Sequence, residues 1–598
     1  MYLTQTGGVF VEAVWRIHAK RADFNALGAR FNIDPVIARI IRNRDLVTEE
    51  DFDGYLNGGL ELAHDPSLMK DMDEACRLMA DKIKAGKLIR IISDYDVDGV
   101  MSNYILLRGL KDAGAIVSYE IPDRLTDGYG INERIIRDAY SDGVDTIITC
   151  DNGIGAFSAI NLAKELGMTV IVTDHHEPPL DEDESGNVYR HFVSADAVVD
   201  PKRPDCEYPF KEICGACVAY KFIYHLYRIM NLSWNDDWFM EMVGMATVCD
   251  IMPLVDENRV YVKKAMALIK NTENIGLKAL LRMNNLMDKK IGSYTFGYIL
   301  GPCINASGRL DSAKKGLELL LIEDMGQALN MAEEIKEINA TRKTMTEQGK
   351  KAAIELVERE YMDDVVLVVY MPELHESLAG LVAGKLKERY NRPTLVFAQA
   401  ENGLLKGSGR SIETYNMFEK LSQHKELFVK MGGHPMAAGF SIEPDKLDIL
   451  RERLNATHGL TPDDLKPVIM IDVPMPFSYI TTNLIKQLDL LEPIGKGNPK
   501  PVFAQANLGV KKVRFMGENN SAIKLWLTDE QGNTIEAVDF DSNSFIESIK
   551  MWFSDEECDK MVQGLPNRVR IDVMYYPSIN EYGGRQTIQL MPQRYNRA

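Results

Sequence analysis

Three short runs of mostly apolar residues, rich in β-branched side chains, each lead directly into acidic or imidazole groups. The runs are 88–92, 146–149 and 169–173, and the segments after them are Asp94-Tyr95-Asp96-Val97-Asp98-Gly99, Asp151-Asn152-Gly153 and Asp174-His175-His176. Runs of this kind are typical of parallel strands that are buried on both faces. Open α/β sheets bind their ligands outside the carboxyl ends of such strands. The pattern therefore predicts an α/β sheet with an acidic site at one edge.

The acidic groups indicate a metal centre. A fourth segment, Cys249-Asp250, adds a further carboxylate. Carboxylates that share a site repel one another, so cations are needed to keep them together. A ligand set of oxygen with some imidazole favours Mn²⁺ or Mg²⁺. Alternate side chains of an extended segment share a face, so Asp94, Asp96 and Asp98 can point at one site, before Gly99 lets the chain turn into a helix.

The two adjacent histidines are the most specific part of this pattern. Neighbouring side chains of an extended chain face opposite ways, so we expect His175 and His176 to divide their roles. One imidazole would bind metal, and the other would contact the substrate or donate a proton. The predicted metal centre therefore combines the three aspartates of the first segment with Asp151, His175 and Asp250.

Composition indicates an ordinary globular protein of several domains. The chain has 598 residues, 45% of them hydrophobic, and three or four domains are expected at this length. We expect no membrane span and no signal peptide, and the eight scattered cysteines suit a reducing cytoplasm. Cys214-Gly215-Ala216-Cys217 has redox spacing, but its apolar surroundings predict a role in the core. The net charge of −19 argues weakly against nucleic acid, because metal-binding acids contribute to it and binding needs only a local basic track.

The order of local patterns predicts an α/β protein with several domains. Alternating strands and helices are followed by helices, a proline-free helical stretch, a second α/β pattern, and short alternating strands that fit a small barrel. The expected divisions are a lead-in over 1–65, a domain over 66–323, a connecting helix over 324–361, a second domain over 362–455 and a barrel over 466–598.

These segments and four later motifs resemble a known family. DYDVDG, DNG, DHH and CDIMPL resemble the DHH phosphoesterase superfamily, and GPCINASGRL at 301–310 resembles a further element of it. GSGRS at 407–411 and GGHPMAAG at 432–439 resemble the DHH-associated domain. EPIGKGNPKP at 492–501 is similar to the beginning of the oligonucleotide-binding (OB) barrel of RecJ exonucleases. The resemblance covers about 70–598 and implies a DHH parallel-sheet domain, a connecting helix, a DHH-associated α/β domain and an OB-like barrel.

The resemblance to RecJ implies a 5′-to-3′ exonuclease that acts on single-stranded DNA in repair and recombination. It also implies two divalent cations, Mn²⁺ or Mg²⁺, between the DHH and DHH-associated domains. The family's metal positions match Asp94, Asp96, Asp98, Asp151, His175 and Asp250. His176 matches the contact to the scissile phosphate and is expected to act in catalysis with Asp151 and Arg309. The pocket for the 5′-terminal phosphate matches Arg124, Ser408 and Arg410, and Arg309 and His434 match further substrate contacts.

Two other functions are compatible with parts of this pattern. One is a phosphodiesterase for short oligonucleotides or cyclic dinucleotides, which would not need the C-terminal barrel. The other is a non-catalytic replication scaffold, which the filled ligand positions argue against. Single-stranded DNA is the expected partner, with a single-strand-binding protein or a helicase as expected protein partners, no membrane, and the cytoplasm as the expected location. Cys303 stands where the family usually has arginine.

The barrel segment carries aromatic and basic residues. Phe503, Phe515, Trp526 and Tyr576 could stack on bases, although aromatic residues of a small barrel more often lie in its core. Lys511, Lys512, Arg514 and Lys524 form a basic track, for which an ordinary solvated face is an open alternative.

Overall fold

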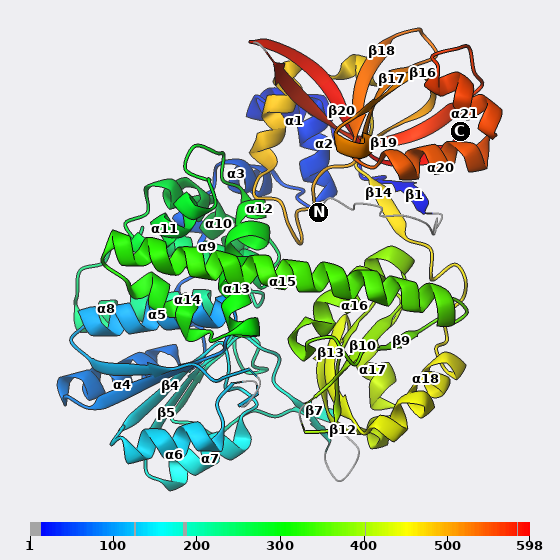
Figure 1. Ribbon diagram of the computed structural model, residues 1–598. Helices are drawn as coiled ribbons and strands as arrows, with labels where there is room; N and C mark the ends of the chain where they lie inside the picture. The colour runs from blue at the N-terminus through cyan, green and yellow to red at the C-terminus, as the bar shows by residue number, and fades with distance from the viewer. Residues whose placement is uncertain (1–12, 125–126, 129, 183–187, 401, 583) are drawn as a thin grey trace. The chain divides into compact units, whose positions relative to one another are not determined.

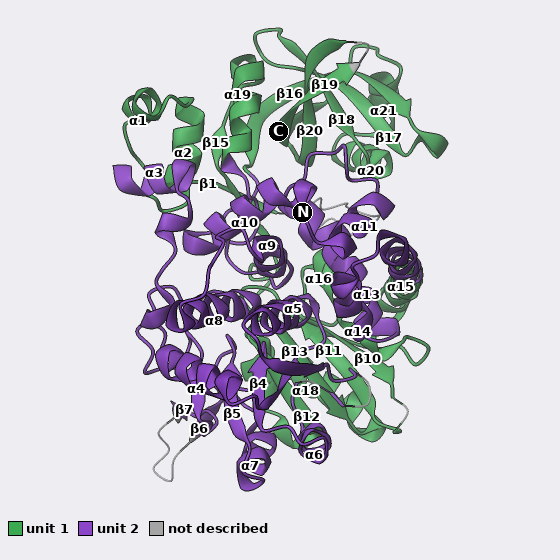
Figure 2. Ribbon diagram, turned by 90° about the vertical axis from the view of Figure 1, so that its left-hand side faces the viewer, with its two compact units in different colours: residues 1–47, 344–490, 501–598 green, residues 48–343, 491–500 purple. Residues whose placement is uncertain are grey.

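The computed structural model describes residues 13–124, 127–128, 130–182, 188–400, 402–582 and 584–598. The chain forms two compact units, which Figure 2 shows in different colours. Unit 1 contains residues 1–47, 344–490 and 501–598, and unit 2 contains residues 48–343 and 491–500. Among the helices of the described ranges, none is both long and apolar enough to cross a membrane.

Unit 2 is built on a five-stranded parallel sheet, in the order β3-β2-β4-β5-β8 (Figure 1). The strands are β2 Leu88–Ser93, β3 Ile116–Glu120, β4 Thr146–Cys150, β5 Thr169–Thr173 and β8 Ala197–Val199. The three predicted runs are therefore confirmed as β2, β4 and β5. The chain adds β3 on one side of β2 and then continues with β4 on the other side. Ligands of open α/β sheets bind at such a reversal of strand order, which here lies between β2 and β4.

Helices cover both faces of this sheet, as the apolar strands require. Side chains alternate between the faces, so Ile91 and Ile148 belong to one buried cluster while Ile92 and Ile147 belong to the other. The first cluster includes α4 Met72–Lys84, α5 Val97–Asp112 and α8 Gly215–Met230, and the second includes α6 Glu133–Ser141 and α7 Phe157–Glu165. The sheet is therefore the middle of three layers, and its strand ends are left for the site.

Unit 2 also has a two-stranded antiparallel sheet, β6 Leu180–Glu182 and β7 Val188–Arg190, and further helices. Its further helices include α3 Glu49–Asn57, α9 Met240–Cys249, α10 Asp256–Leu268, α11 Ile275–Met283, α12 Ser293–Thr295, a π-helical turn over Phe296–Leu300, α13 Gly301–Leu310 and α14 Lys314–Leu321. The long helix that follows, α15 Met325–Glu360, confirms the prediction for 324–361. Its first half belongs to unit 2 and its second half to unit 1.

The α/β part of unit 1 has a mixed sheet in the order β12-β13-β11-β10-β9. Its strands are β9 Leu367–Tyr370, β10 Thr394–Gln399, β11 Leu405–Arg410, β12 Phe428–His434 and β13 Ala437–Ile442, with β9 parallel to β10 and the other pairs antiparallel. Its helices are α16 Ala379–Tyr390, which packs on one face, and α17 Met417–Ser422 and α18 Leu447–Ala456, which pack on the other. The predicted second α/β pattern is confirmed.

The C-terminal part of unit 1 is a closed five-stranded barrel, as predicted. Its strands are β16 Phe503–Met516, β17 Ala522–Thr528, β18 Thr534–Asp539, β20 Arg585–Arg597 and β19 Arg570–Tyr582, and β16 also pairs with β19 to close it. Strand β16 has 14 residues and pairs with two neighbours within the barrel. It pairs with β19 through its first half and with β17 through its second half, with register shifts near the middle. Helices α20 Ser542–Trp552 and α21 Asp555–Val562 lie between β18 and β19 in the chain.

The described N-terminal residues also fold into unit 1. Strand β1 Val14–Ile17 pairs in parallel with β14 Val468–Ile471, just before the barrel begins. Helices α1 Phe24–Phe31 and α2 Pro35–Asn43 follow. After α2, Arg44 Nη1 forms a buried ion pair with Asp472 Oδ1 at 2.8 Å, which fixes the end of this segment to the start of the barrel.

Candidate metal centre

The turn after β2 carries Asp94, Asp96 and Asp98. Asp96 caps α5, because its Oδ1 accepts hydrogen bonds from the N–H groups of Asp98 at 2.9 Å and Gly99 at 3.2 Å. Asp98 therefore lies in the first helical turn, and the expectation of an extended segment through Asp98 is wrong. A Cβ on Gly99 would lie 2.2 Å from the carbonyl oxygen of Asp94, so only glycine permits this close turn.

The start of α8 holds the carboxylate of Asp98. The backbone N–H groups of Gly215 and Ala216 donate to its two oxygens, each at 2.7 Å. The positive end of a helix dipole and its free N–H groups favour an anion there. A Cβ on Gly215 would lie 2.7 Å from Cβ of Asp151, so this helix start contacts two of the predicted ligands.

From the sequence we expected the segment 214–217 only to lie in the core. We did not predict that its backbone N–H groups bind the carboxylate of Asp98. Both cysteines are indeed buried. The signal that was available is Gly215 itself, because a glycine at the first position of an apolar helix indicates a close approach rather than a turn.

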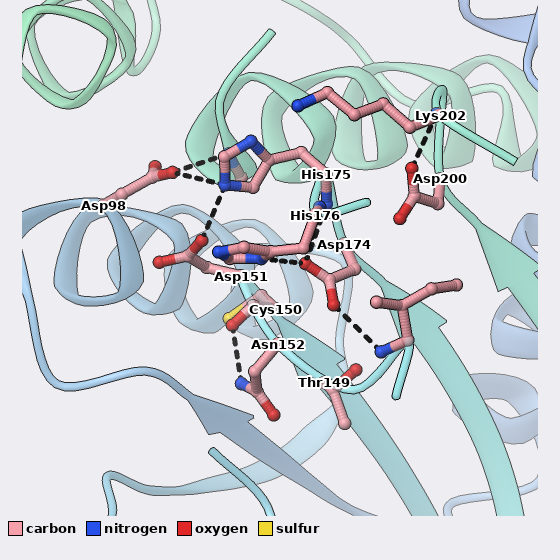
Figure 3. Close-up of polar contacts among 12 residues, drawn as sticks. Asp98, Thr149, Cys150, Asp151, Asn152, Asp174, His175, His176, Asp200 and Lys202 are labelled. Carbon is pink, nitrogen blue, oxygen red and sulfur yellow. Dashed lines mark hydrogen bonds and ion pairs between the residues drawn. The ribbon is translucent and has the colours of Figure 1, made fainter. Parts of the chain in front are cut away.

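Asp151 sits directly after β4 in a strained backbone conformation. Its φ of 59° lies in the left-handed region, which is uncommon for a residue other than glycine. The next residue, Asn152, donates from Nδ2 to the carbonyl oxygens of Ile92 at 3.1 Å and Cys150 at 2.9 Å. These bonds tie the end of β2 to the end of β4 and bring their acidic turns together. Figure 3 shows the bond between Asn152 and Cys150.

The DHH segment turns sharply at Asp174. Its Oδ1 accepts hydrogen bonds from the N–H of His175 at 2.8 Å and from Nδ1 of His176 at 2.7 Å, while its Oδ2 accepts from the N–H of Ile154 at 2.9 Å. Because of this turn, the two imidazole rings lie only 4.4 Å apart between centroids. The expectation that they face opposite ways is therefore wrong.

The two histidines nevertheless have different surroundings. Nε2 of His175 lies 3.0 Å from Oδ1 of Asp151 and 3.6 Å from carboxylate oxygens of both Asp98 and Asp250, and its side chain is 3% exposed. The side chain of His176 is 43% exposed and pairs with Asp174 (Figure 3). His175 faces the acids, whereas His176 is accessible to a substrate.

The structure brings all six predicted ligands together. Three sets of side chains each offer ligand atoms within 4.8 Å of one another: Asp94, Asp96 and Asp151; Asp98, His175 and Asp250; and Asp151, His175 and His176. Asp151 belongs to two of these sets. Asp250 reaches them from the end of α9, which places it beside Asp98 and His175.

The acids of this cluster are strongly perturbed. Burial, followed by repulsion from neighbouring carboxylates, raises the pKa of Asp94, Asp151 and Asp250 well above its usual value, and raises the pKa of Asp98 to about 6. Within the described ranges, Oδ1 of Asp94 and Oδ2 of Asp250 are buried without a hydrogen-bond partner. Divalent cations would relieve the repulsion and give these oxygens a partner, so the donor set fits Mn²⁺ or Mg²⁺.

The two histidines titrate in opposite directions. Burial, then the neighbouring His176, lower the pKa of His175 well below its usual value, which keeps it in the neutral form that binds metals. Burial would also lower the pKa of His176, but the Asp174 carboxylate raises it to about 9. For Asp174, the effect of burial is outweighed by both imidazoles and its hydrogen bonds, and its pKa falls to about 2.

Helix α13 packs against the acidic turn after β2. Asn305 Oδ1 accepts a hydrogen bond from the N–H of Val97 at 3.2 Å, and a Cβ on Gly308 would lie 2.8 Å from the carbonyl oxygen of Tyr95. Arg309 lies on the same helix, so its backbone is fixed beside the turn. Cys303 on the same helix is buried, and its Sγ accepts a hydrogen bond from Asn339 Nδ2 at 3.3 Å.

Arg124 lies near the same turn. Its guanidinium group is 4.7 Å from the centroid of the Tyr95 ring. It also lines a pocket of about 170 Å³ together with Asp123, Ser312 and Lys314. An arginine at the wall of a pocket beside an acidic cluster suits a phosphate group.

The three predicted phosphate contacts of unit 1 gather at the ends of β11 and β12. Arg410 and His434 both pair with Ala437 of β13, so they lie in one row across the sheet. Nη1 of Arg410 donates to Oγ of Ser408 at 2.9 Å. A Cβ on Gly380 of α16 would lie 2.8 Å from Nη2 of Arg410, so the helix leaves room for the guanidinium group.

Comparisons with known proteins identify the family. The DHH family N-terminal domain matches residues 88–246, the DHHA1 domain matches 363–458, and the RecJ OB domain matches 471–594. The single-stranded-DNA-specific exonuclease RecJ of Bacillus subtilis (strain 168) is 33% identical over 581 residues, which cover 96% of this chain and 70% of the relative. The chain belongs to the RecJ family.

Other RecJ proteins match over nearly the whole chain. RecJ of Escherichia coli (strain K12) is 29% identical over 585 residues, which cover 94% of this chain and 95% of the relative. The crystal structure of RecJ in complex with Mn²⁺ from Thermus thermophilus is 25% identical, with a TM-score of 0.80 over 98% of this chain and 80% of that one. The predicted fold class, with DHH, DHH-associated and OB-like parts, is confirmed.

Proposed function

We propose that this chain is a metal-dependent exonuclease that hydrolyses single-stranded DNA from the 5′ end, in DNA repair and recombination. The observation that carries this proposal is the cluster of five aspartates and His175 at the strand-order reversal of the sheet, in a chain of the RecJ family. Bound there, two divalent cations would activate a water molecule and stabilise the oxygen that leaves.

The chain's own residues then have separate tasks. We assign Asp94, Asp96, Asp98, Asp151, His175 and Asp250 as metal ligands. Asp151 belongs to two of the three sets, so it is the carboxylate best able to serve both cations. The start of α8 fixes the orientation of Asp98, as its two N–H bonds indicate. Ligand orientation of this kind contributes to metal affinity.

His176 is assigned to the scissile phosphate. Its raised pKa keeps the ring charged at neutral pH, with Nδ1–H donating to the carboxylate of Asp174. A charged donor of this kind can hold a phosphate oxygen or pass a proton to the leaving group. Arg309 is assigned to the same substrate from α13.

Further polar side chains are assigned to phosphates of the DNA strand. Arg124 of unit 2 is assigned to a terminal phosphate, and Ser408 and Arg410 of unit 1 are likewise assigned to phosphate, because arginine binds phosphate oxygens through paired N–H groups. His434 would contact the strand beside Arg410, with which it shares a row of the sheet.

The barrel is assigned to the affinity for long strands. On its outward face, the ammonium groups of Lys512 and Lys524 lie 5.3 and 5.7 Å from the centroid of the half-buried Trp526 ring. A basic and aromatic surface binds single strands without reading their sequence. Phe503, in contrast, is fully buried in the core. A single-strand-binding protein or a helicase would be protein partners of this exonuclease, and the cytoplasm its location.

One experiment separates this function from its alternatives. Labelled single strands, the matching duplex, single-stranded RNA and a cyclic dinucleotide are incubated with Mn²⁺, Mg²⁺ or a chelator. We expect mononucleotide release from single-stranded DNA, none in chelator, and none from the Asp151→Ala variant. Preferred cleavage of the cyclic dinucleotide would favour the small-substrate phosphodiesterase, and a folded, metal-binding protein without hydrolysis would favour the scaffold.

A further inference from the structure

A tight turn follows β8 at the edge of the unit 2 sheet. Val199 of β8 pairs with Thr173 of β5, so the residues after β8 emerge beside the DHH segment. The N–H of Arg203 approaches the carbonyl oxygen of Asp200 at 3.4 Å, and Pro201 occupies the second position, as in a β-turn. Oδ1 of Asp200 also accepts a hydrogen bond from the N–H of Lys202 at 2.7 Å.

Both ends of this turn are fixed inside unit 2. The Asp200 side chain is fully buried. Arg203 is 5% exposed, and its Nη1 forms an ion pair with Asp71 at 2.5 Å. Its guanidinium group also stacks 4.6 Å from the centroid of Phe192. The backbone of the turn is therefore held rigidly, and it presents the side chain of Lys202.

Lys202 points at the metal centre. Its side chain extends toward the ring of His175 (Figure 3). Its charge acts on two of the assigned ligands, because it lies near enough to His175 and Asp250 to lower the pKa of both. Across the described ranges, the ammonium group forms no hydrogen bond or ion pair with a carboxylate or carbonyl group. A rigidly presented cation thus faces the site without a partner.

We propose that Lys202 binds a phosphate of the DNA strand at the metal centre, either the reacting phosphate or its direct neighbour. This inference rests on the proposed exonuclease function and assigns that site a further substrate-binding residue. The lysine ammonium group is a compact charge that binds phosphate oxygens well. Lys202 follows β8, whereas His176 follows β5. The two side chains would therefore approach the DNA from the ends of different β-strands.

A different role would give a different result. If Lys202 only offset the charge of the acids, its removal would change metal affinity and leave the contact with each phosphate unchanged. The two roles are separated by substrates that each carry one uncharged methylphosphonate linkage, placed in turn at the first few linkages from the attacked end.

The variants are Lys202→Ala and Lys202→Arg, with Lys111→Ala as the matched control. Lys111 is an exposed lysine near the far end of α5, about 20 Å along that helix from Asp98. Each variant is measured for kcat/KM at saturating Mn²⁺, for Mn²⁺ affinity, and for the dependence of strand binding on salt. Lys202→Ala should lower kcat/KM by about 10- to 100-fold, the effect of one lost charged hydrogen bond. For Lys202→Ala, the slope of log binding constant against log salt concentration should fall in magnitude by about 0.7. Lys202→Arg should retain part of the activity.

The neutral linkages give the decisive result. Wild type should be more sensitive than Lys202→Ala to the neutral group at the linkage that Lys202 contacts, and the two proteins should be equally sensitive at the other linkages. The inference is overturned if Lys202→Ala shows the wild-type sensitivity at every linkage, or if its loss disappears when Mn²⁺ is raised. Because wild type is measured alongside, the absence of any wild-type hydrolysis would overturn the proposed exonuclease function instead.

Discussion

Replacing Gly215 by alanine should damage the metal centre although Gly215 binds no metal. The added Cβ would lie 2.7 Å from Cβ and 3.0 Å from Cα of Asp151. Carbon atoms in contact prefer about 3.5–4.0 Å, so Asp151 or the start of α8 must move by about 1 Å. Metal–ligand distances tolerate only about 0.2 Å, so such a shift would take the Asp151 carboxylate out of ligand geometry.

The expected losses follow from that displacement. Overpacking should lower the free energy of unfolding by about 1–3 kcal/mol. Mn²⁺ affinity should fall by about 10- to 100-fold or more, because changes to residues that orient metal ligands have effects of this size. The value of kcat/KM should fall with it. Calorimetric titration with Mn²⁺ measures the affinity, and denaturant unfolding in chelator measures the stability.

Gly384→Ala is the matched control for this experiment. Gly384 lies within α16, and a Cβ there would meet nothing within 4 Å. This variant should keep wild-type Mn²⁺ affinity and gain up to about 1 kcal/mol of stability from helix propensity. If Gly215→Ala is folded and binds Mn²⁺ as tightly as wild type, the start of α8 does not shape the metal centre.

Three further outcomes are expected. Arg124→Ala should reduce kcat/KM about 10- to 100-fold more on 5′-phosphorylated than on 5′-hydroxyl strands, through one lost charged hydrogen bond, and an equal loss on both would show that Arg124 does not hold the terminal phosphate. Trp526→Ala should weaken the binding of long strands by about 1–3 kcal/mol per stacked base without changing Mn²⁺ affinity, and unchanged strand binding would place the DNA elsewhere. Because the pKa of His176 is raised to about 9, its stabilising contribution is complete below about pH 6.5 and is lost as pH rises through about 9. Denaturant unfolding in chelator should therefore show a stability loss over that window in wild type but not in His176→Gln, and identical pH dependence in both proteins would contradict the assignment.

The sequence predicted the site well where the relevant pattern is local. The strands β2, β4 and β5 follow from short runs of residues, and the acids follow those runs directly in the chain. Since parallel strands end at one edge, their side chains had to meet there. This is why the five predicted ligands that follow β2, β4 and β5 come together, whereas Asp250 joins them from the end of a helix, α9.

The parts that the sequence did not reveal depend on contacts between distant residues. Gly215 and Ala216 bind Asp98 although they lie more than a hundred residues later in the sequence. No local pattern predicts that contact. The prediction that His175 and His176 face opposite ways failed for a related reason. Side chains alternate only while the chain stays extended. Asp174 ends the extended run by binding the backbone of the next residues.

The segment 491–500 is a second part of the chain whose distant contacts the sequence did not reveal. It follows β14 in the chain and was expected within the barrel, yet its contacts belong to unit 2. The N–H of Leu254 donates to the carbonyl oxygen of Lys496 at 2.7 Å, and Oγ of Ser293 donates to that of Ile494 at 2.6 Å. Truncation before the barrel would remove these contacts, so point substitutions in the full chain are the sounder test of the barrel.

The central claim is that the six assigned ligands form one metal centre. It is tested most directly by anomalous diffraction at the manganese edge from crystals of the full chain soaked in Mn²⁺. We predict two anomalous peaks about 3.5–4 Å apart, both within ligand distance of this cluster. Peaks located away from Asp98, Asp151 and His175, or no peaks at Mn²⁺ concentrations that support hydrolysis, would contradict it.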